Sequence, residues 1–234
     1  MTKVAILGFG TVGSGVAEVL SKNSQGIARR SGGEIQVKYI LDVRDFPDSP
    51  FKDCFVKDFS IIENDPEVDV VVETIGGAKV ALEFTTRALK AGKSVVSSNK
   101  ELVATHGYEL LQLAKANGVS YLFKASVGGS IPILRPLTNC LAANEVEQIT
   151  GILNGTTNYI LTRMIKAGLT FEQALKEAQD NGYAEKDPTA DVDGHDACRK
   201  ICILAALAYG QHVYPVQVAT QGIRSLSLED VSYA

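Results

Sequence analysis

The first half of the chain alternates short apolar runs with longer segments in which apolar residues recur at helical spacing. Such continuous apolar runs are typical of parallel strands that helices cover on both faces. The expected strands cover 3–7, 35–41, 68–74, 93–97 and 119–124, and the clearest expected helices cover 80–91 and 101–117. Strands that alternate with helices predict an α/β fold, a Rossmann-type doubly wound parallel sheet, over residues 1–125.

The pattern changes after residue 125, where a glycine loop interrupts the alternation. The expected elements beyond it are a helix that ends near Ala143, a strand over 146–153, and helices over 154–165 and 170–181. This mixture predicts a second domain of the α+β class over residues 126–234.

An acidic stretch, 185–196, is followed by residues 197–200 and then directly by the most apolar segment, 201–208. Helix propensity places the start of a helix near the end of the acidic stretch, and a helix that is apolar all round is a buried helix. Steps of three and four residues back from Ile203 reach Lys200 and then Asp196. These two charges therefore continue a stripe that otherwise packs inward.

A lysine and an aspartate four residues apart usually form a weak ion pair on a solvated helix turn. The apolar continuation of this stripe favours another interpretation, because an unpaired charge is rarely buried without a use or a partner. A lysine that is removed from water gives up its proton more readily, which suits proton transfer near neutral pH. We interpret Lys200 as a catalytic acid/base, and Asp196 as its orienting partner or as a ligand for a polar group of the substrate.

A glycine motif, GFGTVG at residues 8–13, lies between the first strand and the first helix. A strand, G-x-G-x-x-G and then a helix form the fingerprint of a dinucleotide-binding site. Gly8 makes the tight turn, Gly10 lets the pyrophosphate approach the backbone, and Gly13 lets the helix pack on the strand. The helix N-terminus then faces the phosphates, so the motif predicts binding of NAD or NADP.

The second expected strand is followed by Asp42 and, two residues further, Arg44. An acid in this place binds the ribose 2′-hydroxyl of NAD, whereas a nearby arginine accommodates the 2′-phosphate of NADP. The chain has both, so the choice between NAD and NADP stays open. Arg44 is equally compatible with a solvated loop residue.

Further candidates follow other expected strands, because open α/β sheets bind ligands at the carboxyl ends of their strands. Residues 75–77 form a cofactor-side loop, and Ser98, Asn99 and Lys100 follow the next strand. Lys100 is a candidate site residue, although a solvated lysine at the start of a helix has the same pattern. Asn154 either caps a helix or helps to form an anion site at its N-terminus.

Composition narrows the class of protein and its partners. The 234 residues are 45% hydrophobic and 21% charged, as in globular proteins. A net charge of −4 without a basic run indicates neither nucleic acid nor an anionic membrane as a partner. The longest apolar run is too short to span a bilayer, and the N-terminus enters a strand without the pattern of a signal peptide, so we expect a cytoplasmic protein.

The 4 cysteines show no C-x-x-C spacing and are expected to be reduced thiols. His195, Cys198 and Cys202 would share one helical face and form half of a metal site. No fourth ligand suggests itself, so no metal site is predicted.

Several motifs follow one another along the chain: GFGTVG (8–13), ETIGG (73–77), SNK (98–100), ASVGGSIP (125–132), GILNGTTNYI (151–160) and DPTADVDG (187–194), then Asp196 and Lys200. Together they resemble the homoserine dehydrogenase family, and the resemblance extends over essentially the whole chain. The family reduces L-aspartate 4-semialdehyde to L-homoserine with NAD(P)H, on the route to threonine and methionine, as a dimer built through the second domain.

The resemblance implies that Lys200 is the acid/base at the substrate oxygen and that Lys100 is a second essential lysine beside it. It makes residues 126–234 the substrate-binding, catalytic and dimerisation domain, with a pocket formed by Glu185, Asp191, Asp196, Gly155, Thr156 and Tyr183. The expected coenzyme-binding residues are Gly8, Gly10, Thr11, Val12, Gly13, Asp42, Arg44, Thr74, Gly76, Ser98 and Asn99. The chemistry agrees, because an ammonium-bearing substrate needs carboxylates and an aldehyde that accepts hydride needs a proton donor.

The chain departs from the family at two points. The family usually has a glutamate just before the Ala-x-Val-Gly loop, where it helps backbone carbonyls to bind a monovalent cation. This chain has Lys124 there, so we predict no sodium or potassium ion between Val127 and Gly129. The family's catalytic region also extends beyond the position of Ala234, so we expect a second domain that is incomplete at its C-terminus and a chain without the threonine-sensing domain of many members.

Two other functions are compatible with parts of the sequence. A semialdehyde dehydrogenase that oxidises through a thioester needs an activated cysteine with a histidine base. None of the cysteines lies at a loop-to-helix turn with a plausible histidine, which disfavours that chemistry. A dinucleotide-binding module that senses redox state or serves assembly without turnover stays open.

Overall fold

The chain forms two compact units, residues 1–129 and 130–234. The computed structural model describes residues 1–129 and 131–233, so Ser130 of the glycine loop and the terminal Ala234 lie outside the described residues. The boundary expected from the sequence, after residue 125, falls a few residues earlier. Each unit has its own hydrophobic core and is described by itself.

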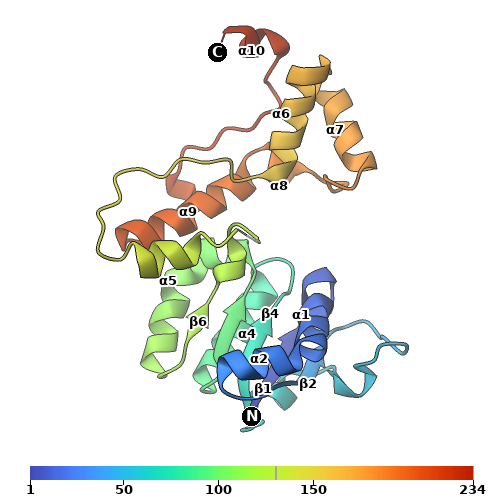
Figure 1. Cartoon of the computed structure of the whole chain (residues 1–234), viewed down its shortest axis with the longest axis vertical. Helices are drawn as coiled ribbons and strands as arrows, with labels where there is room; N and C mark the ends of the chain where they lie inside the picture. The colour runs from blue at the N-terminus through green and yellow to red at the C-terminus, as the bar shows by residue number, and fades with distance from the viewer. Residues whose placement is uncertain (130, 234) are drawn as a thin grey trace. The chain divides into compact units, whose positions relative to one another are not determined.

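The first unit is a six-stranded parallel sheet with the strand order β3-β2-β1-β4-β5-β6 (Figure 1). The strands are β1 (Thr2–Leu7), β2 (Ile35–Leu41), β3 (Phe55–Val56), β4 (Val68–Glu73), β5 (Ser94–Ser97) and β6 (Tyr121–Leu122). The strand order reverses between β1 and β4, which makes this pair the topological switch point of the sheet. The predicted Rossmann-type parallel sheet is confirmed.

Helices lie between most of these strands along the chain, as parallel neighbours require. They are α1 (Thr11–Lys22), α2 (Ser24–Ser31), α3 (Phe59–Glu63), α4 (Lys79–Lys90) and α5 (Lys100–Ala116). Helix α1 packs on the sheet through the buried Gly13 and Ala17, whereas Val12 and Val19 are 51% and 52% exposed. Small residues on the inner face let the helix approach the strands closely, so the larger valines point outward.

The register of the sheet aligns the carboxyl ends of four strands. Leu7 of β1 pairs with Leu41 of β2 and with Glu73 of β4. Glu73 pairs in turn with Ser97 of β5. The next residues along these strands therefore leave the sheet at one edge, and they are Gly8, Asp42, Thr74 and Ser98. The sequence-predicted coenzyme residues thus begin at a common edge.

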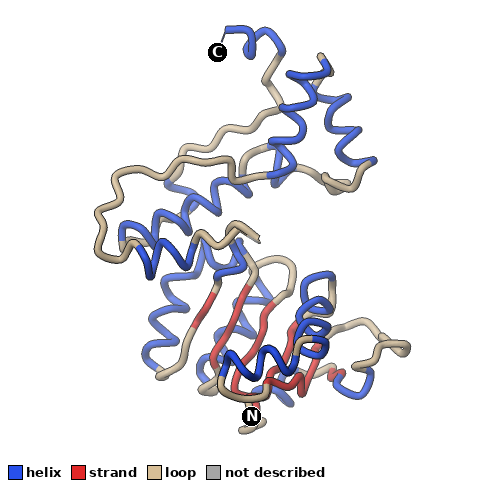
Figure 2. Tube along the Cα trace, viewed as in Figure 1, coloured by secondary structure: helices blue, strands red, loops and turns tan. Residues whose placement is uncertain are grey.

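The second unit consists of helices and extended segments (Figure 2). Its helices are α6 (Gly155–Ala167), α7 (Phe171–Asp180), α8 (Thr189–Val192), α9 (His195–Tyr209) and α10 (Leu228–Tyr233). The core lies between α6, α7 and α8 and contains Ile160, Met164, Phe171 and Val192. Thr170 caps α7 in a capping box with Gln173, which fixes the start of that helix. Within residues 1–129 and 131–233, no helix has the length and apolar character needed to cross a membrane.

Of the elements expected in the second unit, one is absent from its described residues and another is shortened. Residues 146–153 are extended but form no strand, because no described strand of this unit offers them a hydrogen-bonded partner. The helix expected to end near Ala143 is reduced to a π-helical turn, Pro136–Cys140. Pro136 lies in the first turn of this helical segment, where a missing amide hydrogen is tolerated, so the proline does not explain the shortening.

Helix α9 is buried around its middle but not along its whole length. Asp196, Cys198 and residues 202–204 are buried, whereas residues 205–208 are partly exposed and Tyr209 is exposed. Its most extensive contacts with other helices and turns are with α8, Pro136–Cys140 and Pro215–Gln217, and its C-terminal half is incompletely covered. The expectation of complete burial is therefore wrong, but the face that carries Asp196 is an inner face.

Two backbone segments approach each other closely beside the acidic stretch. A Cβ atom on Gly222 would lie 2.5 Å from the Val192 carbonyl oxygen, and a Cβ atom on Gly194 would lie 2.9 Å from the Gln221 carbonyl oxygen. The Ile223 amide donates to the Val192 carbonyl oxygen at 2.8 Å. Residues 221–223 are therefore packed against residues 192–194 without a side chain between the two backbones.

Candidate functional site

The glycine turn after β1 has the shape that a dinucleotide site requires. A Cβ atom on Gly13 would lie 1.9 Å from the Gly8 carbonyl oxygen and 2.9 Å from Thr74 Oγ1, so only glycine fits between helix and turn. A Cβ atom on Gly10 would meet nothing within 4 Å, so its backbone faces open space. Close packing at Gly13 and open approach at Gly10 are the roles that the motif assigns to these positions.

The N-terminus of α1 offers amide groups to an anion. Gly10 is the N-cap of α1, and no side chain in the described part of the chain caps that end. The first amides of such a helix have no partner within the helix and attract phosphate groups. Thr11 and Val12, two predicted coenzyme residues, lie exposed on this first turn. These observations fit the pyrophosphate of NAD or NADP.

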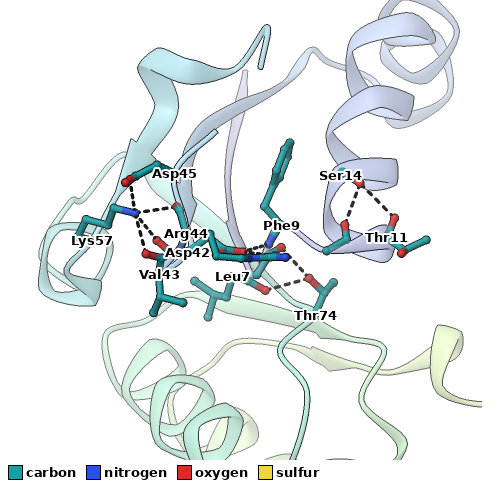
Figure 3. Close-up of polar contacts among 12 residues, drawn as sticks. Leu7, Phe9, Thr11, Ser14, Asp42, Val43, Arg44, Asp45, Lys57 and Thr74 are labelled. Atoms are coloured by element: carbon teal, nitrogen blue, oxygen red, sulfur yellow. Dashed lines mark hydrogen bonds and ion pairs between the residues drawn. The ribbon is translucent and has the colours of Figure 1, made fainter. Parts of the chain in front are cut away.

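Thr74 ties the two central loops of the sheet together. Its hydroxyl lies 2.9 Å from the Leu7 carbonyl oxygen and 3.0 Å from that of Gly8, and it can donate to either (Figure 3). Its amide also donates to the Leu7 carbonyl oxygen at 3.0 Å. Thr74, predicted as a coenzyme residue, therefore holds the glycine turn from the side of β4.

Asp42 and Arg44 form a two-pronged ion pair at the end of β2. Asp42 Oδ1 accepts from Arg44 Nε and Asp42 Oδ2 accepts from Arg44 Nη2, both at 3.0 Å. Asp42 also accepts from the amides of Phe9 at 2.6 Å and Arg44 at 2.9 Å, and is only 9% exposed. The Arg44 guanidinium, helped by these amides, holds the pKa of the Asp42 carboxyl well below its usual range despite burial. The two residues that would choose between NAD and NADP thus contact each other.

Lys57 supports this loop, and no sequence motif marks it. Its ammonium lies within hydrogen-bonding distance of the backbone carbonyls of Asp42, Val43 and Arg44, at 3.1, 3.1 and 2.7 Å (Figure 3). It also pairs with Asp45 at 2.8 Å. One cation therefore fixes the backbone that carries both Asp42 and Arg44.

The loops after β4 and β5 are joined by a buried polar network. Glu73 is fully buried and accepts from Ser97 Oγ at 2.5 Å and from the Ile75 amide at 2.7 Å. Asn99 caps α5 and donates to the carbonyls of Ile75 at 3.0 Å and Gly77 at 2.7 Å. The Asn99 amide is thus engaged within the protein, and its predicted contact with the coenzyme stays a prediction.

Three more of the predicted site residues, Gly76, Ser98 and Lys100, follow β4 and β5. Gly76 is exposed in the loop after β4, and the partly exposed Ser98 donates its amide to the Glu73 carbonyl oxygen at 3.3 Å. Lys100 is the first residue of α5. Lys100 belongs to the first unit and Lys200 to the second, so the pairing of two lysines implied by the resemblance stays a prediction.

Replacing Glu73 by glutamine is expected to flatten the pH dependence of stability. Burial raises the pKa of the Glu73 carboxyl, against the opposing hydrogen bonds from Ser97 and Ile75. A carboxyl whose folded pKa is raised stabilises most below its unfolded pKa of about 4.3, and this contribution is lost as the pH rises through the folded value. Urea unfolding between pH 4.5 and 7.5 measures the effect. As the pH rises, the free energy of unfolding of Glu73→Gln should increase relative to that of the wild type.

The exposed Glu83 provides the control, because Glu83→Gln should leave that pH dependence unchanged. A parallel pH dependence for Glu73→Gln and the wild type would contradict the expectation.

In the second unit, Lys200 and Asp196 form an ion pair away from bulk water. Lys200 Nζ lies 2.6 Å from Asp196 Oδ2 and donates to the Leu153 carbonyl oxygen, also at 2.6 Å. The side chains are only 16% and 8% exposed. The pair is therefore not a solvated surface pair, and a proton donor and a carboxylate share one interior position.

Asn154 brings a second carboxylate to this pair. Its amide nitrogen donates to Asp191 Oδ1 at 2.7 Å and to Asp196 Oδ2 at 2.9 Å. The sequence alone predicted Asn154 either as a helix cap or as part of an anion site. It could not predict the contacts with Asp191 and Asp196, because these residues are 37 and 42 positions away along the chain. Its position directly before Gly155, at the start of α6, is the only signal that the sequence offers.

The remaining predicted pocket residues lie on the same unit with different environments. Thr156 Oγ1 donates to the Tyr183 carbonyl oxygen at 2.9 Å, and Gly155 is the first residue of α6. The Tyr183 side chain is exposed and packs against the Tyr159 ring, and Glu185 is exposed. The structure thus gathers Asp191, Asp196 and Lys200 into one cluster, and the predicted role of Glu185 in the pocket stays a prediction.

Among the described residues, no three His, Cys, Asp or Glu side chains gather as a metal site would require. Lys124 lies exposed before the glycine loop. The expected absence of a sodium or potassium ion at that loop stays a prediction.

Both units match known proteins. Residues 8–124 match the family described as "Homoserine dehydrogenase, NAD binding domain", and residues 132–234 match "Homoserine dehydrogenase". The chain is 43% identical over 237 residues to the homoserine dehydrogenase of Bacillus subtilis, which covers 99% of this chain and 54% of that protein. It spans about half the length of the curated relatives it matches.

Solved structures give the same result. A homoserine dehydrogenase from Thiobacillus denitrificans superposes with a TM-score of 0.92 at 42% identity, over 99% of this chain and 54% of that one. A hyperthermophilic archaeal homoserine dehydrogenase in complex with NADPH superposes with a TM-score of 0.82 at 29% identity, over 96% of this chain and 74% of that one.

Proposed function

The chain belongs to the homoserine dehydrogenase family, and we propose that it takes part in the NAD(P)-dependent interconversion of L-aspartate 4-semialdehyde and L-homoserine, on the route to threonine and methionine. The observation that carries the proposal is the pairing of Lys200 with Asp196 at 2.6 Å in a position removed from bulk water. A proton donor held in this way is what reduction of an aldehyde to an alcohol requires.

The residues of the chain account for the proton in this reaction. A bound nicotinamide coenzyme supplies the hydride to the carbonyl carbon, or accepts it in the reverse direction. Negative charge develops on the carbonyl oxygen as the hydride arrives, and the Lys200 ammonium donates a proton to that oxygen. In the reverse direction the neutral Lys200 amine accepts the hydroxyl proton. Asp196 and the Leu153 carbonyl hold the Lys200 nitrogen in place for both steps.

The charges around Lys200 suit an amino-acid substrate. Asp191, Asp196 and Lys200 together carry an excess of negative charge, which favours a substrate ammonium group. The N-terminus of α6, at Gly155 and Thr156, is adjacent and suits a carboxylate. Lys100, Glu185 and Tyr183 complete the proposed site by resemblance alone.

Replacing Arg44 by serine is expected to weaken NADPH binding about 10- to 100-fold while NADH binding is kept or improved. Hydrogen bonds to charged groups contribute about 1.5–3 kcal/mol, and loss of Arg44 removes them from the 2′-phosphate. The same change frees Asp42 from its ion pair, so its carboxylate can accept from a ribose hydroxyl. Fluorescence titration of both coenzymes measures the effect, and equal losses for the two would contradict it.

The proposed function is tested by coenzyme consumption. The purified chain is mixed with NADPH or NADH, and absorbance is followed when aspartate semialdehyde is added. Turnover supports the dehydrogenase. Tight coenzyme binding without turnover would favour the alternative, a dinucleotide-binding module that serves sensing or assembly, because the glycine turn fits the coenzyme without help from the second unit.

We also propose that the protein acts in the cytoplasm as a homodimer built through the second unit, as the family resemblance implies. The partly exposed apolar face of α9 supports an assembly role for this unit. Light scattering at micromolar concentration measures the mass directly, and a monomer at every concentration would reject the dimer.

A further inference from the structure

Asn154 uses every hydrogen-bonding group of its side chain within the protein. The amide oxygen accepts from the Thr157 amide at 2.8 Å and so caps α6. The amide nitrogen donates to Asp191 Oδ1 at 2.7 Å and to Asp196 Oδ2 at 2.9 Å. Only this orientation of the amide is chemically acceptable, because the rotated form would point its oxygen at two carboxylates. The residue is only 7% exposed, so water does not replace these contacts.

The same Asp196 oxygen joins Asn154 to the proposed proton donor. Asp196 Oδ2 accepts from Asn154 Nδ2 at 2.9 Å and lies 2.6 Å from Lys200 Nζ. Lys200 Nζ also donates to the carbonyl of Leu153, the residue directly before Asn154. One short stretch before α6 therefore holds the lysine twice, once through a carbonyl and once through the carboxylate that Asn154 orients.

A helix cap alone does not require this arrangement. A serine or aspartate would cap α6 as well as asparagine does. Neither can donate two hydrogen bonds at once to a pair of carboxylates at neutral pH. Two negative side chains brought together would repel each other unless a donor lay between them.

We propose that Asn154 is a positioning residue: it bridges Asp191 and Asp196 and thereby sets the direction in which Lys200 presents its proton. This role rests on the proposed function of Lys200. The bridge also fixes the spacing of the two carboxylates that face a substrate ammonium group.

Two variants separate the positioning role from the capping role. Asn154→Ser and Asn154→Asp both keep an N-cap residue for α6, so loss of the cap does not explain their effects, and coenzyme affinity should be unchanged. Both variants should lower the melting temperature because the two carboxylates lose their donor, and Asn154→Asp should lower it more because it adds a third carboxylate. Asn154→Ser should lower kcat about 100-fold, because small misplacements of a reacting group have effects of this size. Asn154→Asp should be slower at neutral pH but recover in part relative to the wild type as the pH falls, since a protonated aspartate can donate one of the two hydrogen bonds.

The control is Thr170→Ala, which removes the cap of α7 in the same unit. It should lower the melting temperature without changing kcat or the pH profile. Wild-type kcat and pH profile in both Asn154 variants would overturn the proposal.

A second measurement does not depend on turnover. The Cε resonance of Lys200, assigned in lysine-labelled protein by its absence from Lys200→Arg, should shift or broaden in Asn154→Ser and stay unchanged in Thr170→Ala. An unchanged resonance in Asn154→Ser would overturn the positioning role. Absence of wild-type turnover together with a shifted resonance would reject the proposed function but keep the bridge.

Discussion

Lys200→Ala is expected to lower turnover of aspartate semialdehyde about 1,000-fold, within the range that general acid–base catalysis contributes. Affinity for NADPH or NADH should be unchanged, because the glycine turn and the Asp42–Arg44 pair belong to the first unit. The measurement compares kcat from coenzyme absorbance with Kd from fluorescence titration. Equal rates in variant and wild type would end the acid/base assignment.

A second substitution removes the ambiguity that alanine introduces. Lys200→Ala leaves the Asp196 carboxylate buried without its cation, which by itself destabilises a protein. Lys200→Arg keeps a positive charge at this position, but a guanidinium does not give up its proton in the physiological range. We expect a folded protein with turnover as low as that of Lys200→Ala. Lys166→Ala, at an exposed position of α6, should behave as the wild type.

Gly13→Ala is expected to destabilise the protein by about 3 kcal/mol, which corresponds to a melting temperature lower by about 10 °C. The added Cβ atom would lie 1.9 Å from the Gly8 carbonyl oxygen, a distance that no rotamer change relieves because both atoms are fixed to the backbone. Helix α1 must move away from the turn, so coenzyme affinity should fall at least 10-fold through loss of the phosphate cradle. Calorimetry and fluorescence titration measure the two effects.

Gly15→Ala is the matched control, two residues further along the same helix. A Cβ atom on Gly15 would meet no atom within 4 Å, and alanine is favoured over glycine within a helix by about 1 kcal/mol. We expect it to be at least as stable as the wild type. If both alanine variants behaved alike, close packing at Gly13 would not be the reason for its glycine.

The strands of the first unit could be predicted because burial on both faces requires unbroken apolar runs. Strand β2 covers the predicted residues, Ile35–Leu41, and β5 differs from the prediction only at its start. Strand β6, predicted over 119–124, is limited to Tyr121–Leu122 at the edge of the sheet, where only one neighbour supports it. Helix α2 (Ser24–Ser31) has no buried residue, so no apolar period marks it in the sequence.

The second unit was less predictable, because its elements depend on contacts between distant residues. The extended segment 146–153 is as apolar as a strand but has no described strand beside it. The position of Lys200 on an inner helix face could be inferred from spacing, since Asp196 and Ile203 lie on the same stripe. The bridging role of Asn154 could not, because local spacing says nothing about carboxylates 37 and 42 residues away.

The supports of the coenzyme loop escaped prediction for a similar reason. The ammonium of Lys57 contacts backbone carbonyl oxygens. Every residue has a backbone carbonyl, so the residue types in this loop do not reveal the contact. The Phe9 ring packs edge-on against Phe46 and Phe55, each with ring centroids 5.1 Å apart, which joins the glycine turn to the loop after β2. Phe9, which lies between the first two glycines of the motif, thus contributes to packing.

The close contact between Gly222 and Val192 has a consequence for shortened versions of this protein. Residues 221–223 pack across the backbone just before α9. This packing requires glycine at position 222, because any larger side chain would collide with the Val192 carbonyl oxygen. A chain cut before residue 221 would lose the hydrogen bond from the Ile223 amide to the Val192 carbonyl oxygen. It would also lose the ion pair between Arg224 Nε and Asp193 Oδ1, which lie 2.5 Å apart. A purification tag or a fused reporter therefore belongs beyond Arg224, where it leaves the neighbouring carboxylates undisturbed.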